Sequence, residues 1–172
     1  RSDILSNVVE GVIRLLMFLA YIAVIGRIGE IRRVFMYHGA EHMTVHSQER
    51  GEALSVENVR RHPTAHPRCG TAFLLVVMVV AVAVFAFVGR EPLWWLIASR
   101  VVLIPVIAAA GYEVIRLGGR HSEHSLVRLI NGPSLTLQAL TTRQPQEDQI
   151  EIAIAAMRHT IEADEGSAAH VG

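Results

Sequence analysis

The chain contains no lysine, because all 16 of its basic residues are arginine. Schiff-base chemistry on lysine is therefore excluded, and so is a P-loop, which needs its lysine to bind phosphate. Basic and acidic residues also balance, so the formal net charge is zero. Without a positive field to attract nucleic acid, we expect no nucleic-acid partner.

Cysteine is almost absent as well, since Cys69 is the single thiol among 172 residues. One cysteine excludes a disulfide within the chain, and it favours a reducing compartment or a thiolate that binds metal. The first residue is Arg1 rather than methionine, and no signal peptide is visible. We therefore expect the sequence to be a fragment of a longer protein.

Apolar residues are abundant instead: they make up 51% of the chain, and its mean hydropathy is +0.36, which is high for a soluble domain. Residues 1–26 predict a first membrane helix, with residues 4–26 as its apolar part. Residues 71–115 predict a transmembrane hairpin of two further helices, 71–88 and 93–115. The predicted fold is therefore all-α: a polytopic membrane protein with three transmembrane helices plus cytoplasmic and interfacial helices.

Arginine is distributed unevenly around these predicted spans. Seven arginines lie in residues 27–70, one lies in the turn at 89–92, and five follow the third span. By the positive-inside rule, residues 27–70 and the C-terminal part should be cytoplasmic. Residues 116–145 should form an interfacial or re-entrant segment, and residues 146–172 an amphipathic C-terminal helix and a tail.

The polar segment 27–70 carries the pattern H-x-x-E-H at His38, Glu41 and His42. In a helix, His38, His42 and His46 fall at i, i+4 and i+8, on one face. Two imidazoles one turn apart can reach a single metal ion, and Glu41 could act as a general base on a water that the metal activates. The alternative is that Glu41 orients a histidine or pairs with an arginine.

Two further donors follow in the same segment, His66 and Cys69. Cys69 stands just before the second predicted span, where a helix N-terminus favours the thiolate. His38, His42 and Cys69 would give zinc, or another divalent transition metal, three ligands and an open position, whereas His66 as a fourth ligand would close the site. A lone cysteine can also be a small buried hydrophobic residue.

Glu113 lies near the cytoplasmic end of the third predicted span, and an ionisable residue at membrane depth is a functional candidate. It could be an additional metal ligand or hold one in place. The alternative is an ion pair with Arg116, or with Arg14 or Arg100.

Three motifs carry a family resemblance, and they include the proposed ligands. They are Tyr37-His38-Gly39-Ala40-Glu41-His42, His66-Pro67-Arg68-Cys69-Gly70-Thr71 and Gly111-Tyr112-Glu113-Val114-Ile115-Arg116. With them, nearly the whole chain resembles the YqhQ family of bacterial membrane proteins. That family is described as predicted metal-dependent enzymes of unknown function, so the resemblance implies metal at the histidine motifs. Met43, where the family pattern has lysine, and a less acidic turn at residues 144–146 are departures that touch no proposed ligand.

Two functions from different classes follow. The first is an integral protein of the bacterial inner membrane with a cytoplasm-facing zinc site, which acts as a hydrolase on a membrane-associated peptide or a lipid-linked substrate. The second is a non-enzymatic, homo-oligomeric channel, transporter or scaffold in which the metal is a structural clip. A three-ligand site fits the first function and a closed four-ligand site the second.

Overall fold

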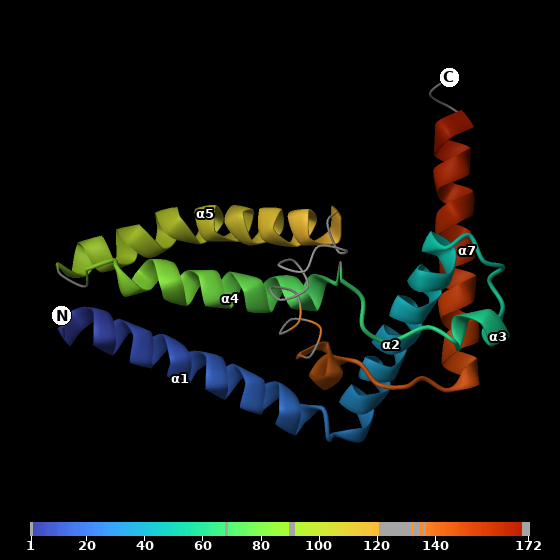
Figure 1. Ribbon diagram of the computed structural model, residues 1–172, viewed down its shortest axis with the longest axis horizontal. Coiled ribbons are helices and arrows are strands. Elements are labelled where there is room, and N and C mark those ends of the chain that lie inside the picture. Colours follow the sequence, from blue (N-terminus) through green and yellow to red (C-terminus); the bar gives the residue numbers. More distant parts are fainter. Residues whose placement is uncertain are drawn as a thin grey trace. The chain divides into compact units, whose positions relative to one another are not determined.

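The computed structural model describes residues 2–67, 69–89, 92–120, 132, 135 and 137–169, and in these ranges it contains helices and no strand. The all-α prediction is therefore confirmed for the described part of the chain. In chain order the helices are α1 (Ser2–Ile25), α2 (Gly29–Glu49), α3 (Val56–Val59), α4 (Gly70–Ala86), α5 (Leu93–Arg120) and α7 (Glu147–Ala169) (Figure 1).

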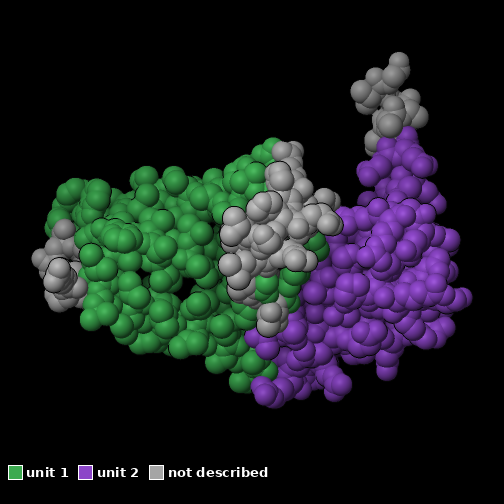
Figure 2. Space-filling view, viewed as in Figure 1, with its two compact units in different colours: residues 1–24, 67–137 green, residues 25–66, 138–172 purple. Residues whose placement is uncertain are grey.

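The chain forms two compact units (Figure 2). Unit 1 consists of Arg1–Val24 and Pro67–Leu137 and contains α1, α4 and α5. Unit 2 consists of Ile25–His66 and Gln138–Gly172 and contains α2, α3 and α7. Unit 2 is thus discontinuous in sequence, and a main-chain hydrogen bond from Arg143 N to Phe35 O, 2.9 Å long, joins its two segments.

Among the described residues of unit 1, two helices are long and apolar enough to cross a membrane, Ile4–Ile25 and Leu93–Leu117. The prediction of three such helices is therefore wrong in number, because the apolar stretch of α4, Phe73–Ala86, is shorter. Helix α4 begins at Gly70, one residue before the predicted span, but ends at Ala86, two residues before the predicted end. The Cys69 side chain accepts a hydrogen bond from Thr71 N and caps the first turn, and the chain leaves the helix at Phe87. The remaining 17 residues span about 25 Å, less than the ~30 Å of a hydrocarbon core.

Small residues allow close packing in unit 1. A Cβ built on Gly111 of α5 would stand 2.8 Å from Val77 Cγ2 of α4, and one built on Gly11 of α1 would stand 2.6 Å from Val82 Cγ1. The Asn7 amide also donates to the main-chain oxygen of Ala86, 3.4 Å away. Close approach at glycine is a common way for membrane helices to pack.

The core of unit 2 lies between α2, α3 and α7. Its largest members, Met43, Val59 and Ile150, are fully buried, and Ala40 and Ile154 complete the cluster. Ile150 and Ile154 lie one turn apart on α7, as the amphipathic stripe predicted. The C-terminal helix itself is longer than expected, since α7 continues to Ala169.

The segment 116–145 differs in part from its prediction. Helix α5 continues through the first residues of this range to Arg120, and residues 137–141 are helical. The interfacial or re-entrant prediction rested on residues 125–141, and most of these, 125–131, 133, 134 and 136, lie outside the described residues.

Candidate metal centre

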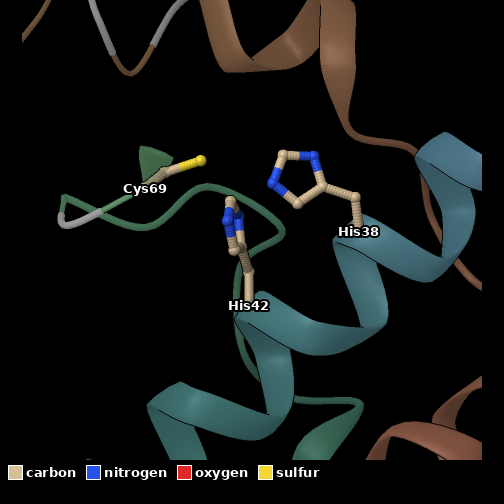
Figure 3. Close-up of side chains that lie close together, drawn as sticks. All are labelled: His38, His42 and Cys69. Carbon is tan, nitrogen blue, oxygen red and sulfur yellow. The ribbon is translucent and has the colours of Figure 1, made fainter. Parts of the chain in front are cut away.

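Helix α2 presents three histidines on one face, at successive turns. The ring centroids of His38 and His42 are 4.3 Å apart, and Figure 3 shows both imidazoles on the same side of the helix. Beyond His46 the helix ends in a Schellman motif, in which Gly51 N and Glu52 N donate to the main-chain oxygens of Gln48 and Ser47. Gly51 has φ +67°, a conformation that glycine adopts without strain.

Main-chain carbonyls fix the orientation of the first two rings. His38 Nδ1 lies 2.9 Å from Thr141 O, and His42 Nδ1 lies 2.7 Å from Thr64 O. Because a carbonyl oxygen only accepts, each ring donates from Nδ1, and a neutral ring then carries its lone pair on Nε2. Histidines that bind metal are held in this way, with the non-ligating nitrogen donating to a carbonyl or carboxylate.

His66 joins this face from the segment that follows α3. Its ring centroid lies 5.9 Å from that of His42 and 4.6 Å from that of His46. The buried Gln138 amide holds the His66 backbone, accepting from His66 N at 2.8 Å and donating to His66 O at 2.9 Å. His66 is only 4% exposed, so both its main chain and its ring are fixed within unit 2.

Glu49 is a donor that the sequence interpretation missed. Its Oε2 lies 3.2 Å from His66 Nε2, and the ligand atoms of His46, Glu49 and His66 all lie within 4.8 Å of one another. The signal was the spacing H-x-x-E from His46 to Glu49, which places both residues on one helix face. Burial lowers the pKa of the His46 imidazole, and the nearby His66 and His62 rings lower it further, although the hydrogen bond to Ala65 O opposes this shift.

His62 is close to this face but lacks a nitrogen for metal. Its Nε2 lies 2.8 Å from Glu52 Oε2, and its Nδ1 lies 3.0 Å from Arg50 Nη1. The guanidinium can only donate, so Nδ1 accepts and Nε2 donates. Both ring nitrogens therefore have protein partners, and His62 is a structural residue.

Cys69 belongs to unit 1, whose second segment begins at Pro67, and it is 5% exposed. Its Sγ lies 3.0 Å from Thr71 Oγ1, and Figure 3 labels it together with the two histidines. It follows His66 by three residues, so the chain itself keeps the two Cα atoms within about 11 Å of each other. Because it belongs to the other unit, its part in the metal site stays a prediction.

The two predicted carboxylates differ from the histidines in exposure. Glu41 is exposed and lines a shallow groove between α2 and α7, together with Tyr37 and Met157. Its role as a general base stays a prediction. Glu113 is exposed on α5 and pairs with Arg116 at 2.9 Å, which was the alternative weighed against metal binding.

Comparison with known proteins places the chain in a family. Residues 1–163 match the model of a protein family of unknown function, DUF1385. The chain belongs to this family. A relative in Bacillus subtilis (strain 168), the uncharacterized protein YqhQ, is 35% identical over 153 residues, which cover 89% of this chain. The match covers 48% of YqhQ, so the chain spans about half the length of that relative. No solved structure matches the chain.

The family membership confirms the resemblance that the histidine motifs carried. The descriptions of the family and of YqhQ name no cofactor or reaction. A metal site in this DUF1385 member therefore rests on the chemistry of its own residues.

Proposed function

We propose that this chain is a bacterial inner-membrane protein that binds zinc, or another divalent transition metal, through His38, His42 and Cys69. We further propose that it is a hydrolase of a membrane-associated peptide or a lipid-linked substrate. The observation that carries the proposal is the pair of carbonyl contacts, from His38 to Thr141 and from His42 to Thr64, which select the tautomer that binds metal through Nε2.

The donor set fits zinc. Two imidazoles and a thiolate are ordinary zinc ligands, and three protein ligands leave a position for substrate or water. The three-residue connection from His66 keeps Cys69 within reach of the histidine face. When bound, zinc supplies Lewis-acid activation of water or of a substrate carbonyl.

Glu41 would act as the general base in this hydrolysis. It immediately precedes His42 on α2, and its exposed carboxylate can exchange protons with solvent. A positioned carboxylate that accepts a proton from water contributes about 10²–10⁴-fold to rate. The groove that Glu41 lines with α7 would receive part of the substrate.

The path of the chain supports a membrane hairpin made of α4 and α5. Residues 25–66 and 138–172 fold into one unit, so the chain between them must leave and return on the same side of a bilayer. If α5 crosses, a second crossing is required, and α4 is the apolar helix next to it in sequence. A 17-residue helix lies at the lower limit for spanning, and local thinning of the bilayer accommodates it.

The arginine distribution supports a cytoplasmic location for unit 2 and an external one for the turn near Gly89, by the positive-inside rule. Labelling with a membrane-impermeant maleimide tests this in intact cells, using Gly89→Cys in a Cys69→Ser background. We expect labelling of Gly89→Cys from outside and no external labelling of Gln48→Cys in the same background. The reverse pattern would contradict the orientation.

Metal analysis of the purified chain tests the site. We expect His42→Ala and Cys69→Ala each to lose one equivalent of zinc, whereas His159→Ala, at an exposed position on α7, should keep it. Zinc contents equal to that of the native protein in both ligand variants would overturn the proposal. Circular dichroism of each variant shows whether the helices are retained.

A structural clip is the second candidate function, in a homo-oligomeric channel, transporter or scaffold. The observation in its favour is burial, because His42 and His66 are 5% and 4% exposed and a closed four-ligand site suits a buried position. Glu41→Gln separates the two functions in a cell that lacks its own family member. A hydrolase should keep its zinc and lose complementation, whereas a clip should keep both.

A further inference from the structure

We infer that His46, Glu49 and His66 form a second metal site in unit 2, separate from the site proposed at His38, His42 and Cys69. It would take a divalent transition ion such as Zn²⁺. This inference does not depend on the first site, because all three residues belong to unit 2 and none is a ligand in the three-residue set. It assigns His66 to the second site rather than to the first.

The distances suit a bound cation. The ligand atoms of the three residues lie within 4.8 Å of one another, and Glu49 Oε2 lies 3.2 Å from His66 Nε2. Ligands about 2.0–2.1 Å from a tetrahedral zinc stand about 3.3–3.4 Å apart. The distance between Glu49 Oε2 and His66 Nε2 is therefore close to the distance between two ligands of one zinc ion. Small side-chain rotations would bring the His46 nitrogen to a similar distance.

The orientation of His46 fits the same role. Its Nε2 lies 2.9 Å from Ala65 O and must donate to this carbonyl, so the neutral ring carries its lone pair on Nδ1. His38 and His42 instead donate from Nδ1. The α2 histidines are thus held by carbonyls in both possible tautomers, each with one nitrogen suited to a metal.

The neighbouring pair of His62 and Glu52 shows what a merely structural pair looks like here. It has the same carboxylate–imidazole contact, 2.8 Å long, but Arg50 donates to the second ring nitrogen. A guanidinium at that position excludes a metal cation, whereas His46, the other imidazole of the proposed site, contacts a neutral main-chain carbonyl. The pair of His62 and Glu52 is therefore a matched control.

Zinc titration of the metal-depleted full chain in detergent tests the inference, with Zn²⁺ alone as the probe. We expect the native chain to bind two equivalents, Glu49→Gln and His46→Gln one each, and Glu52→Gln two. Glu49 is partly exposed, so Glu49→Gln is a mild change for folding. Retention of the native stoichiometry in both Glu49→Gln and His46→Gln would overturn the second site.

Cobalt substitution identifies which ion is lost. A site with Cys69 gives a thiolate-to-cobalt charge-transfer band, and a site of two imidazoles and a carboxylate does not. We expect Glu49→Gln to keep this band and Cys69→Ser to lose it while one Co²⁺ stays bound. If the band is absent from the native chain but Glu49→Gln still removes one ion, the first site fails and the second stands. If instead the native chain binds one ion, and Glu49→Gln and Cys69→Ser each remove it, the two residues share a single site. That result would overturn the inference.

Discussion

Gly39 of α2 lies directly against the main-chain oxygen of Arg143: a Cβ built on Gly39 would stand 2.2 Å from that oxygen. The approach brings residues 141–143 onto the helix, where Thr141 O contacts the ring of His38. The absence of a side chain at position 39 therefore helps to orient the preceding residue, His38, which is a proposed metal ligand.

The first prediction concerns this approach. Gly39→Ala should lower the stability of unit 2 by about 1–3 kcal/mol, because a main-chain atom cannot rotate away from the new methyl group as a side chain can. Thermal unfolding in detergent measures the change. Gly29→Ala on the same helix is the control, since a Cβ there meets nothing within 4 Å and should change stability by less than about 1 kcal/mol. Equal melting temperatures for the two variants would contradict the prediction.

A second prediction concerns the buried Gln138 amide. Gln138→Met removes the partners of both His66 N and His66 O, and each unsatisfied buried group costs about 1–3 kcal/mol. We expect a lower melting temperature and weaker zinc binding at His66. Gln144→Met, at an exposed position, should leave both unchanged. Native zinc affinity in Gln138→Met would show that the amide does not position His66.

The third prediction compares two isoleucines of α7. Ile150 is fully buried in the core of unit 2, whereas Ile152 is 53% exposed. Truncation of a buried isoleucine to alanine costs about 2–5 kcal/mol, whereas exposed substitutions usually change stability by less than about 0.5 kcal/mol. Unfolding of Ile150→Ala and Ile152→Ala measures the difference. Similar losses in the two variants would mean that α7 buries a different face.

The fourth prediction concerns the packing of α4 on α5. Gly111→Ala should destabilise unit 1 by about 1–3 kcal/mol, because the new Cβ would meet Val77 Cγ2 at 2.8 Å. Val77→Ala removes that methyl group, so the double variant should recover part of the loss. A double-mutant cycle on thermal unfolding measures this coupling. Simple additivity of the two single changes would contradict direct contact between the residues.

The sequence was sufficient for features that a local pattern encodes. The spacing of His38, His42 and His46 predicted one helix face, and the apolar stripe with Ile150 and Ile154 predicted the buried side of α7. Both follow from the 3.6-residue period, which needs no knowledge of distant segments. The second predicted span, 71–88, ends two residues early at Ala86, because hydropathy counts apolar residues and does not locate helix ends.

The polar contacts of the site could not be predicted from the sequence, because they depend on segments that are distant in the chain and not on a local pattern. The carbonyls that hold His38 and His42 come from the last residue of a short helical stretch and from the irregular segment after α3. Every residue type has a carbonyl, so no side-chain pattern marks Thr141 or Thr64. Glu49 did have a local signal in its spacing from His46. Its contact with His66 depends on the return of the chain after α3, which the spacing alone does not specify.

The interleaved order of the two units has a consequence for biosynthesis. His38 and Thr141 are separated by 103 residues, so the carbonyl that orients this imidazole is translated long after the ring itself. At about 5–20 residues per second, the delay is roughly 5–20 s. During this interval the newborn α2 lacks the α7 residues that pack against Met43, so we expect a chaperone or the translocation machinery to shield this apolar face until α7 emerges.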